Sequence, residues 1–252
     1  MKHKIFDCIT FYDENLLVNS RFEILNEVVD YFIICESKYD HKGNKKNINF
    51  KLSNNKFSQK IKHIVIEENF PDLSGGWAIE TYQREKILNH IKEADDDDYI
   101  MYSDSDEIPN PITLKNLILK KKYGIFLQKC FNYKFNLFNK YESPWEGTRV
   151  CKKKNLTSID FMRQKVKSKN LNYSIIRVDK EKNIELVNNG GWHFNNLLSV
   201  SEISLKLKTF AHIEFSGSKF SSTQTIKKKI EKKIDLFGRG HHYQVVKLDS
   251  SF

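Results

Sequence analysis

Strand-like and helix-like segments alternate along the first half of this chain, and this alternation constrains the fold more than any other feature. Segment 30–36 is a short, nearly continuous apolar run, which is typical of a strand buried on both faces of a parallel sheet. Segments 19–29 and 77–94 carry apolar residues at helical spacing. The alternation predicts an α/β fold, a mostly parallel sheet flanked by helices, with ligands at the carboxyl ends of the strands. Further strands are predicted at 5–11, 61–67 and 99–102.

The second half of the chain is richer in predicted strands. Asn110 and Pro111 open a predicted helix that continues to residue 121, because a helix tolerates Pro in its first turn. No internal repeat and no Pro- or Ser-rich linker occurs, so one domain spanning residues 1–252 is expected. Strands are predicted at 125–138, 148–152, 173–178 and 184–187, and helices at 158–166, 200–209 and 223–236.

Composition narrows the class of protein. The 252 residues are 39% hydrophobic and carry a net charge of +10, which favours anionic partners, but no nucleic-acid motif accompanies the charge and no nucleic acid is expected. The cysteines lack CxxC spacing, which indicates free core thiols rather than a zinc site. No segment approaches the about 20 apolar residues of a membrane helix. A cytoplasmic chain with no transmembrane segment is expected, and peripheral membrane contact through basic patches stays open.

An acidic motif, Ser103-Asp104-Ser105-Asp106-Glu107, directly follows the predicted strand 99–102. Two aspartates one residue apart in a turn can direct their carboxylates toward one divalent cation. Mg²⁺ and Mn²⁺ prefer such oxygen ligands and often share them with substrate phosphates. The alternative is an Asx-type turn, which does not account for the full motif. The motif therefore predicts a diphosphate site with Mn²⁺ or Mg²⁺ as its cofactor.

Four blocks of sequence, in a fixed order along residues 5–215, include this motif. They are Phe6-Asp7 through Glu14-Asn15 to Arg21-Phe22-Glu23; Val29 through Ser37 with Gly43 and Lys46; Arg84-Glu85 with Ser103 through Pro109; and Gly190 through Phe194 with Lys206, Phe210, His212 and Glu214. Together these blocks resemble glycosyltransferase family 17, the family of the bisecting β-1,4-N-acetylglucosaminyltransferases. Their number and order make the resemblance more specific than a lone acidic motif.

The resemblance implies a GT-A-type fold, a Rossmann-like sheet with a divalent metal at the acidic motif. It implies an inverting transfer from a UDP-sugar donor, UDP-N-acetylglucosamine in the family, to a glycan or glycoconjugate acceptor. The chain would divide into a nucleotide-binding half (1–122), an acceptor-side half (123–222) and a C-terminal helix and tail (223–252). The animal members are anchored in the Golgi membrane and act on N-glycan mannose, and because this sequence shows no such anchor their acceptor is not carried over.

Asp104, Asp106 and His193 are the predicted metal ligands. Asp106 is the expected direct ligand, and Asp104 is expected to reach the metal through water or to bind the ribose. His193 follows two glycines, which permit close approach of a ligand, and its imidazole would complete the coordination or contact a phosphate. The alternative is a buried histidine bonded to a backbone carbonyl.

Five residues are predicted to bind the nucleotide sugar in addition to Asp104. Phe11 and Asp13 end the first strand, where this fold usually holds the base. Arg84 offers a bidentate guanidinium to phosphate, unless it pairs with a glutamate of its own helix. Lys206 would contact a phosphate, and Trp192 would stack on the sugar or belong to the core.

An inverting transfer needs a general base that takes the proton of the acceptor hydroxyl. Glu214 and the competing candidate His212 lie near the end of a helical stretch and are separated by one residue. Glu146 lies in a loop before a strand, and Glu107 would support the metal site or cap the following helix. The choice among these catalytic candidates stays open.

The expected function is metal-dependent, inverting transfer of a sugar, expected to be N-acetylglucosamine, from UDP to a carbohydrate hydroxyl. Two other functions remain as alternatives. A metal-dependent nucleotidyltransferase or phosphotransferase would use the same carboxylates, usually with two metal ions, and would not release UDP. A nucleic-acid binding protein would rest on the +10 charge and would bind with steep salt dependence.

Overall fold

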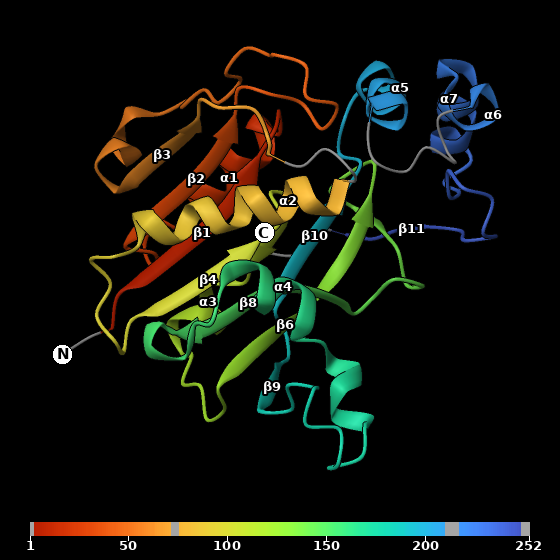
Figure 1. The fold of residues 1–252 in the computed structure, drawn as a ribbon. Coiled ribbons are helices and arrows are strands. Elements are labelled where there is room, and N and C mark those ends of the chain that lie inside the picture. The colour runs from red at the N-terminus through yellow and green to blue at the C-terminus, as the bar shows by residue number, and fades with distance from the viewer. Residues whose placement is uncertain (1–2, 72–75, 210–216, 248–252) are drawn as a thin grey trace.

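The computed structural model describes residues 3–71, 76–209 and 217–247 (Figure 1). Four parallel strands form one half of the sheet: β1 (Ile5–Phe11), β2 (Tyr31–Ser37), β3 (Ile61–Ile66) and β4 (Tyr99–Ser103). Their order is β3-β2-β1-β4. The side chains of β1, β2 and β4 are almost all buried, as expected for parallel strands covered on both faces.

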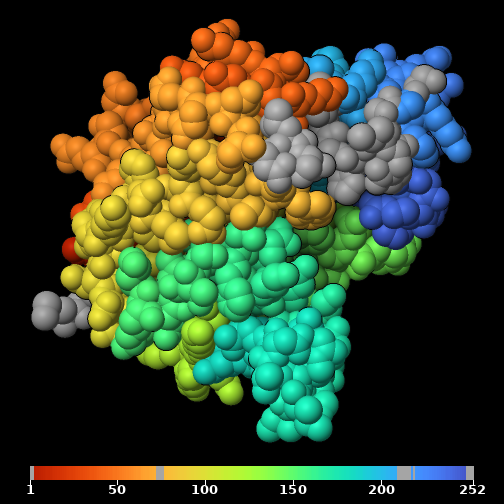
Figure 2. All heavy atoms as spheres, viewed as in Figure 1, coloured from red at the N-terminus to blue at the C-terminus, as the bar shows by residue number. Residues whose placement is uncertain are grey.

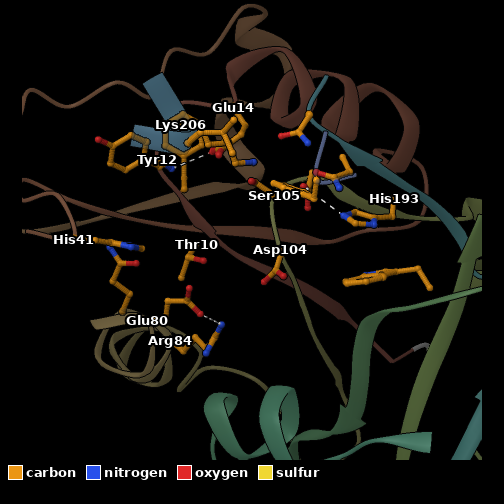
Figure 3. A pocket seen from close by; sticks show the side chains of 18 of the residues that line it. Thr10, Tyr12, Glu14, His41, Glu80, Arg84, Asp104, Ser105, His193 and Lys206 are labelled. Atoms are coloured by element: carbon orange, nitrogen blue, oxygen red, sulfur yellow. Dashed lines mark hydrogen bonds and ion pairs between the residues drawn. The ribbon is translucent and has the colours of Figure 1, made fainter. Parts of the chain in front are cut away.

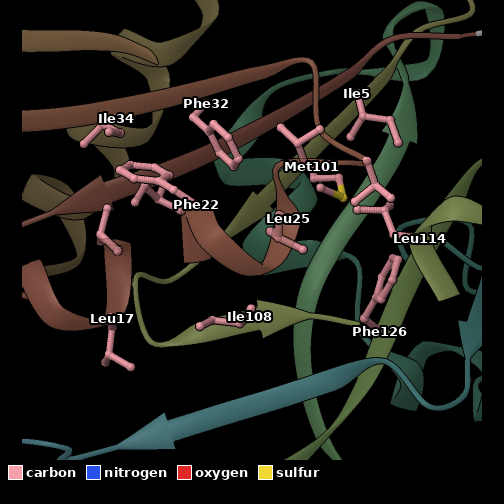
Figure 4. Packing of buried hydrophobic residues seen from close by; sticks show 14 of the residues in the cluster. Ile5, Leu17, Phe22, Leu25, Phe32, Ile34, Met101, Ile108, Leu114 and Phe126 are labelled. Atoms are coloured by element: carbon pink, nitrogen blue, oxygen red, sulfur yellow. The ribbon is translucent and has the colours of Figure 1, made fainter. Parts of the chain in front are cut away.

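Helices cover both faces of these parallel strands. On one face, α1 (Asn15–Leu25) packs Phe22 against Phe32 of β2, with ring centroids 4.8 Å apart (Figure 4). On the other face, α2 (Gly76–Lys86) continues into a 3-10 turn (Ile87–His90) that joins a second apolar cluster. The predicted helices at 19–29 and 77–94 therefore exist, but the first begins four residues earlier and the second ends as an α-helix at Lys86.

The second half extends the sheet with strands of both directions. The antiparallel strand β8 (Trp145–Lys152) lies between β4 and β6 (Tyr123–Asn132), and β6 pairs in parallel with β9 (Ile184–Val187). Strand β10 (Gly191–Asn195) lies parallel to β6 and antiparallel to β5 (Glu107–Pro109). The predicted α/β fold with a β-rich second half is thus confirmed.

The other elements complete the architecture. Asn110 accepts hydrogen bonds from the amides of Ile112 and Thr113 and caps α3, with Pro111 in its first turn as predicted. The remaining elements are α3 (Pro111–Lys115), β7 (Leu137–Phe138), α4 (Ile159–Lys165), α5 (Val200–Thr209), α6 (Ser218–Ser221), α7 (Thr223–Glu231) and β11 (Gln244–Val245), with 3-10 turns at Asn55–Lys60, Lys153–Asn155 and Ser168–Asn172.

Several predicted boundaries in this half are wrong. The predicted strand 125–138 ends at Asn132, because Tyr133 adopts a left-handed conformation (φ 64°) and the chain returns through β7. The predicted strand 173–178 does not form: these residues lie in the connection between α4 and β9, and the edge of β6 pairs with β9 instead. The helices predicted to reach residues 121 and 236 end at Lys115 and Glu231.

Two further expectations concern free core cysteines and membrane-spanning helices. Cys8, Cys35, Cys130 and Cys151 are all buried and free. Within the part of the chain that the structure describes, no helix combines the length and apolarity needed to cross a bilayer.

Candidate active site

A hollow of about 560 Å³ opens at the carboxyl ends of the parallel strands (Figure 3). Thr10 and Phe11 of β1 form part of its wall, and Asp104 and Asp106 follow β4. His193 of β10 also faces the hollow. Side chains of α2 and α5 also contribute to the wall, so segments distant in sequence meet at the edge of the sheet where ligands of α/β proteins bind.

A fully buried arginine supports the acidic motif from behind. The guanidinium of Arg21, on α1, donates to both carboxylate oxygens of Asp7, at 2.5 and 2.6 Å. It also donates to Ser103 Oγ at 2.8 Å and to the backbone carbonyl of Glu107. Arg21 thereby connects β1, the end of β4 and β5. The sequence signal for this role was a charged residue inside the apolar stripe of a helix.

Glu107 is also fully buried, and its carboxylate shapes the turn of the motif. Its Oε1 accepts from Trp145 Nε1 at 2.7 Å and from Arg163 Nη2 at 2.8 Å. Its Oε2 accepts from the amide of Asp104 at 3.1 Å, and Arg163 also forms an ion pair with the Asp104 carboxylate. Because both oxygens are engaged away from the hollow, Glu107 acts as a support; it does not cap α3, where Asn110 is the capping residue.

Asp106 and His193 form a charged pair inside the hollow. Asp106 Oδ2 lies 3.5 Å from His193 Nε2. Burial disfavours ionisation of Asp106, but the imidazole of His193 outweighs it and the pKa of the carboxyl falls to about 2. Burial likewise disfavours protonation of His193, yet the carboxylate raises the pKa of the imidazole well above its usual value. Trp145 stacks on the imidazole with ring centroids 4.5 Å apart and fixes its plane.

Positive side chains approach this pair from two sides. Lys206 of α5 lies on one side of the hollow, and Arg84 of α2 lies on the opposite side (Figure 3). Arg84 is buried and donates to Glu80 at 2.6 Å, to Asp160 at 2.9 Å and to the Tyr102 hydroxyl at 3.3 Å. Arg84 therefore lines the hollow. It also forms the ion pair with a glutamate of its own helix that the sequence offered as the alternative to phosphate binding.

A second hollow, of about 680 Å³, adjoins the first. The two share Glu80, Arg84, Asp104 and Trp145 in their walls. Glu146 lines only the second of these two hollows, and its carboxylate accepts from the amide of Ser168 at 3.1 Å and from Arg149 at 3.3 Å. A substrate bound beside Asp104 could therefore extend from one hollow into the other.

The family model for glycosyltransferase family 17 matches residues 1–241. The chain belongs to glycosyltransferase family 17. The rat and human β-1,4-mannosyl-glycoprotein 4-β-N-acetylglucosaminyltransferases are each 29% identical to it over 117 residues, which is 42% of this chain. The matched segment spans only 22% of the length of these relatives.

Two solved structures with low sequence identity are similar to this family 17 chain. Glucosyl-3-phosphoglycerate synthase from Mycobacterium tuberculosis aligns with a TM-score of 0.42 and 12% identity, over 98% of this chain and 88% of the other. A glycosyltransferase involved in glycosylation of the major capsid of PBCV-1 aligns with a TM-score of 0.35 and 11% identity, over 73% and 81% of the two chains.

The three predicted metal ligands of this family 17 chain are brought to one hollow but play different parts. Asp106 and His193 present a carboxylate oxygen and an imidazole nitrogen side by side; once the imidazole gives up its proton, this donor pair suits a divalent cation that shares its remaining positions with phosphate and water. Asp104 is held by Arg163. No group of three or more His, Cys, Asp or Glu side chains is arranged for a metal among residues 3–71, 76–209 and 217–247.

The predicted nucleotide-sugar ligands are only partly placed on the wall. Phe11, Arg84, Asp104 and Lys206 line the hollow. Asp13 is exposed and absent from the wall, where its neighbours Tyr12 and Glu14 lie instead.

Trp192 is 4% exposed and belongs to the apolar core, because neighbouring residues of β10 point to opposite faces and its neighbour His193 faces the hollow. The tryptophan at the site is Trp145, which was not among the predicted site residues. The glycines before Trp192 serve the sheet rather than a ligand: a Cβ on Gly191 would lie 2.2 Å from the Ile108 carbonyl, and one on Gly190 would lie 2.6 Å from the Leu127 amide.

The residues predicted as general base lie in different parts of the structure. Glu146 borders the second hollow, and Glu107 is buried behind the motif. Glu214, with His212, lies outside the described residues. Glu80 was missed as a candidate although it borders both hollows; its signal was its position one helical turn before Arg84.

Proposed function

We propose that this chain is a metal-dependent, inverting glycosyltransferase that transfers N-acetylglucosamine from UDP to a carbohydrate hydroxyl. The observation that carries the proposal is the pair formed by Asp106, which follows β4, and His193 of β10, facing a hollow that reaches the end of β1. Family membership supports sugar transfer, and the activity in the names of the rat and human relatives supports N-acetylglucosamine as the sugar.

The donor would bind with its diphosphate between the acidic motif and α5. Asp106 and His193 would hold the divalent cation, which when bound neutralises charge on the leaving diphosphate. Lys206 brings a positive charge to the same hollow, and Arg163 holds Asp104 beside it. The base of the nucleotide would lie near Phe11 and Tyr12 at the end of β1.

The acceptor would enter through the second hollow, because it adjoins the first at Asp104 and Trp145. A general base takes the proton of the acceptor hydroxyl, the hydroxyl oxygen bonds to the anomeric carbon, and the bond from that carbon to the diphosphate breaks, releasing UDP. Glu146 already accepts from Ser168 and Arg149. Glu80 borders both the donor hollow and the acceptor hollow, so we assign the base to Glu80, whose carboxylate accepts from Arg84 at 2.6 Å.

A donor screen with Asp106→Ala as its variant tests this proposal. UDP-N-acetylglucosamine and other nucleotide sugars would be incubated with Mn²⁺ and the protein, and UDP release measured. We expect release from wild type to fall at least about 100-fold in the variant or with excess chelator, because metal charge stabilisation is worth several kcal/mol. Glu67→Ala, which removes an exposed acid that directly follows β3 and lines neither hollow, is the control and should behave as wild type.

The products of the same screen separate the competing chemistries. Full UDP release by Asp106→Ala with chelator present would contradict the metal site. Release of pyrophosphate, or transfer of a phosphoryl group, would indicate a nucleotidyltransferase or phosphotransferase instead.

A further inference from the structure

Residues 165–182, which are the last residue of α4 and most of its connection to β9, project from the body of the molecule as a loop of defined shape, the α4–β9 loop (Figures 1 and 2). Asn170 is almost fully buried, and its Nδ2 donates to the carbonyls of Lys165 at 2.7 Å and Glu181 at 3.0 Å, which closes the base of the loop. Backbone hydrogen bonds such as Arg177 N to Ser174 O (2.9 Å) form the turns at its tip. The α4–β9 loop is therefore held by its own contacts, as in compact surface loops that carry function.

The tip of the α4–β9 loop exposes three large apolar side chains. Ile175, Ile176 and Val178 are 88%, 82% and 92% exposed. These residues follow one another within four positions, whereas single exposed apolar residues scattered over a surface are ordinary. An exposed apolar cluster on a shaped, projecting loop indicates an interaction surface.

Positive charge surrounds this apolar tip. Residues 165–182 contain six Lys or Arg and two acids. Asp179 pairs with Arg177 and Lys180, and Glu181 pairs with Lys122 outside the loop, so both acids are already neutralised. Lys165 and Lys169 are exposed and form no ion pair within the described residues. The loop thus presents apolar side chains at its tip and uncompensated cations along the segment that leads to it.

We propose that the α4–β9 loop docks this protein on an anionic membrane surface. Ile175, Ile176 and Val178 insert between lipid headgroups, and the lysines of the loop lie against lipid phosphates. A polybasic segment next to apolar side chains is the combination that binds anionic leaflets, since each part contributes separately. A second copy of the chain is disfavoured as the occupant, because pairing two such loops would bring like charges together.

The base of the loop also belongs to the second hollow. Lys167 and Lys169 line it, together with Asp104 and Trp145. Docking would therefore turn the acceptor side of the site toward the membrane and present it to hydroxyls carried on that surface. This consequence rests on the proposed function, whereas the docking itself does not.

Vesicle cosedimentation tests the docking without any transfer assay, so its failure is distinct from failure of the proposed function. Wild type should bind vesicles of phosphatidylcholine mixed with phosphatidylglycerol and should bind phosphatidylcholine vesicles weakly. Ile175→Ser/Ile176→Ser should weaken binding at least about tenfold, because burial of an isoleucine exceeds the free energy of a tenfold change. Lys165→Gln/Lys169→Gln should weaken it about 25-fold, about fivefold per lost cation.

The control is Ile112→Ser, which removes an exposed isoleucine on α3 and should leave binding unchanged. Equal binding of wild type to both kinds of vesicle, or unchanged binding after either double substitution, overturns the proposal. Gel filtration without vesicles tests the second copy of the chain as the occupant. If wild type is a dimer and Ile175→Ser/Ile176→Ser is a monomer, the loop binds a second copy and the membrane assignment is overturned.

Discussion

Replacement of Arg21 by methionine tests whether the buried support behind the acidic motif holds the fold together. The substitution keeps most of the side-chain volume but removes the guanidinium, which leaves the Asp7 carboxylate buried without its ion-pair partner. Removing one partner of a buried ion pair costs about 3–5 kcal/mol of unfolding free energy. That is a large part of the about 5–15 kcal/mol by which typical domains are stable.

Urea unfolding followed by tryptophan fluorescence measures this loss. Asp7→Leu/Arg21→Met removes both charges and should recover at least half of the stability lost by the single variant, because no unpaired charge stays buried. Arg177→Met, which breaks an exposed pair with Asp179, is the control and should leave the urea midpoint at the wild-type value. A loss below about 1 kcal/mol in Arg21→Met, or a double variant no more stable than the single one, would refute the reasoning.

Three further predictions concern the site and the core. Glu80→Gln should lower kcat about 100-fold or more, as expected for a lost general base, and Glu146→Gln less than about tenfold; equal losses in steady-state assays would reject this assignment of the base. Trp145→Leu should lower kcat/KM roughly 30-fold, because its stacking on His193 and its hydrogen bond to a carboxylate are together worth roughly 2 kcal/mol, and unchanged kinetics would mean that it supports neither. Burial raises the pKa of Cys35 and Cys151 to about 12, so in the native protein below that pH both stay protonated and should resist Ellman's reagent until urea is added; rapid labelling of the native protein would contradict this.

The parallel half of the fold was predictable because its signal is local. Strands buried on both faces leave continuous apolar runs, and β1, β2 and β3 begin and end within a residue or two of the predicted runs. Helix boundaries were less certain, since Asn15, Asn19 and Ser20 are all compatible with a helix start. In the structure Asn19 donates from its side chain to the Asn15 carbonyl, inside α1.

The second half depends on pairings between distant segments, which sequence patterns do not show. Strand β10 was not predicted as a strand, because its first residue is Gly191 and its partners β5 and β6 come from elsewhere in the chain. Segment 173–178 has the β-branched residues of a strand but no partner strand beside it. Its apolar side chains are exposed on the α4–β9 loop and are not part of a sheet.

The same contrast applies to the candidate site. Asp104, Asp106 and His193 stand in short motifs and could be identified from the sequence alone. Trp145 and Arg163 reach the acidic motif from β8 and α4, about 40 and 60 residues further along the chain, so only the tertiary structure reveals them. Trp192 shows the opposite error: it lies beside His193 in sequence, but strand alternation turns it into the core.

Calorimetric titration of UDP into the protein, with Mn²⁺ or with chelator, tests most directly whether Asp106 and His193 form a cation-dependent diphosphate site. Wild type should bind UDP with Mn²⁺ at least about 100-fold more tightly than with chelator, and Asp106→Asn should lose that difference, because the cation joins the protein to the diphosphate. Equal UDP affinity with Mn²⁺ and with chelator, or a full Mn²⁺ effect in Asp106→Asn, would contradict the account.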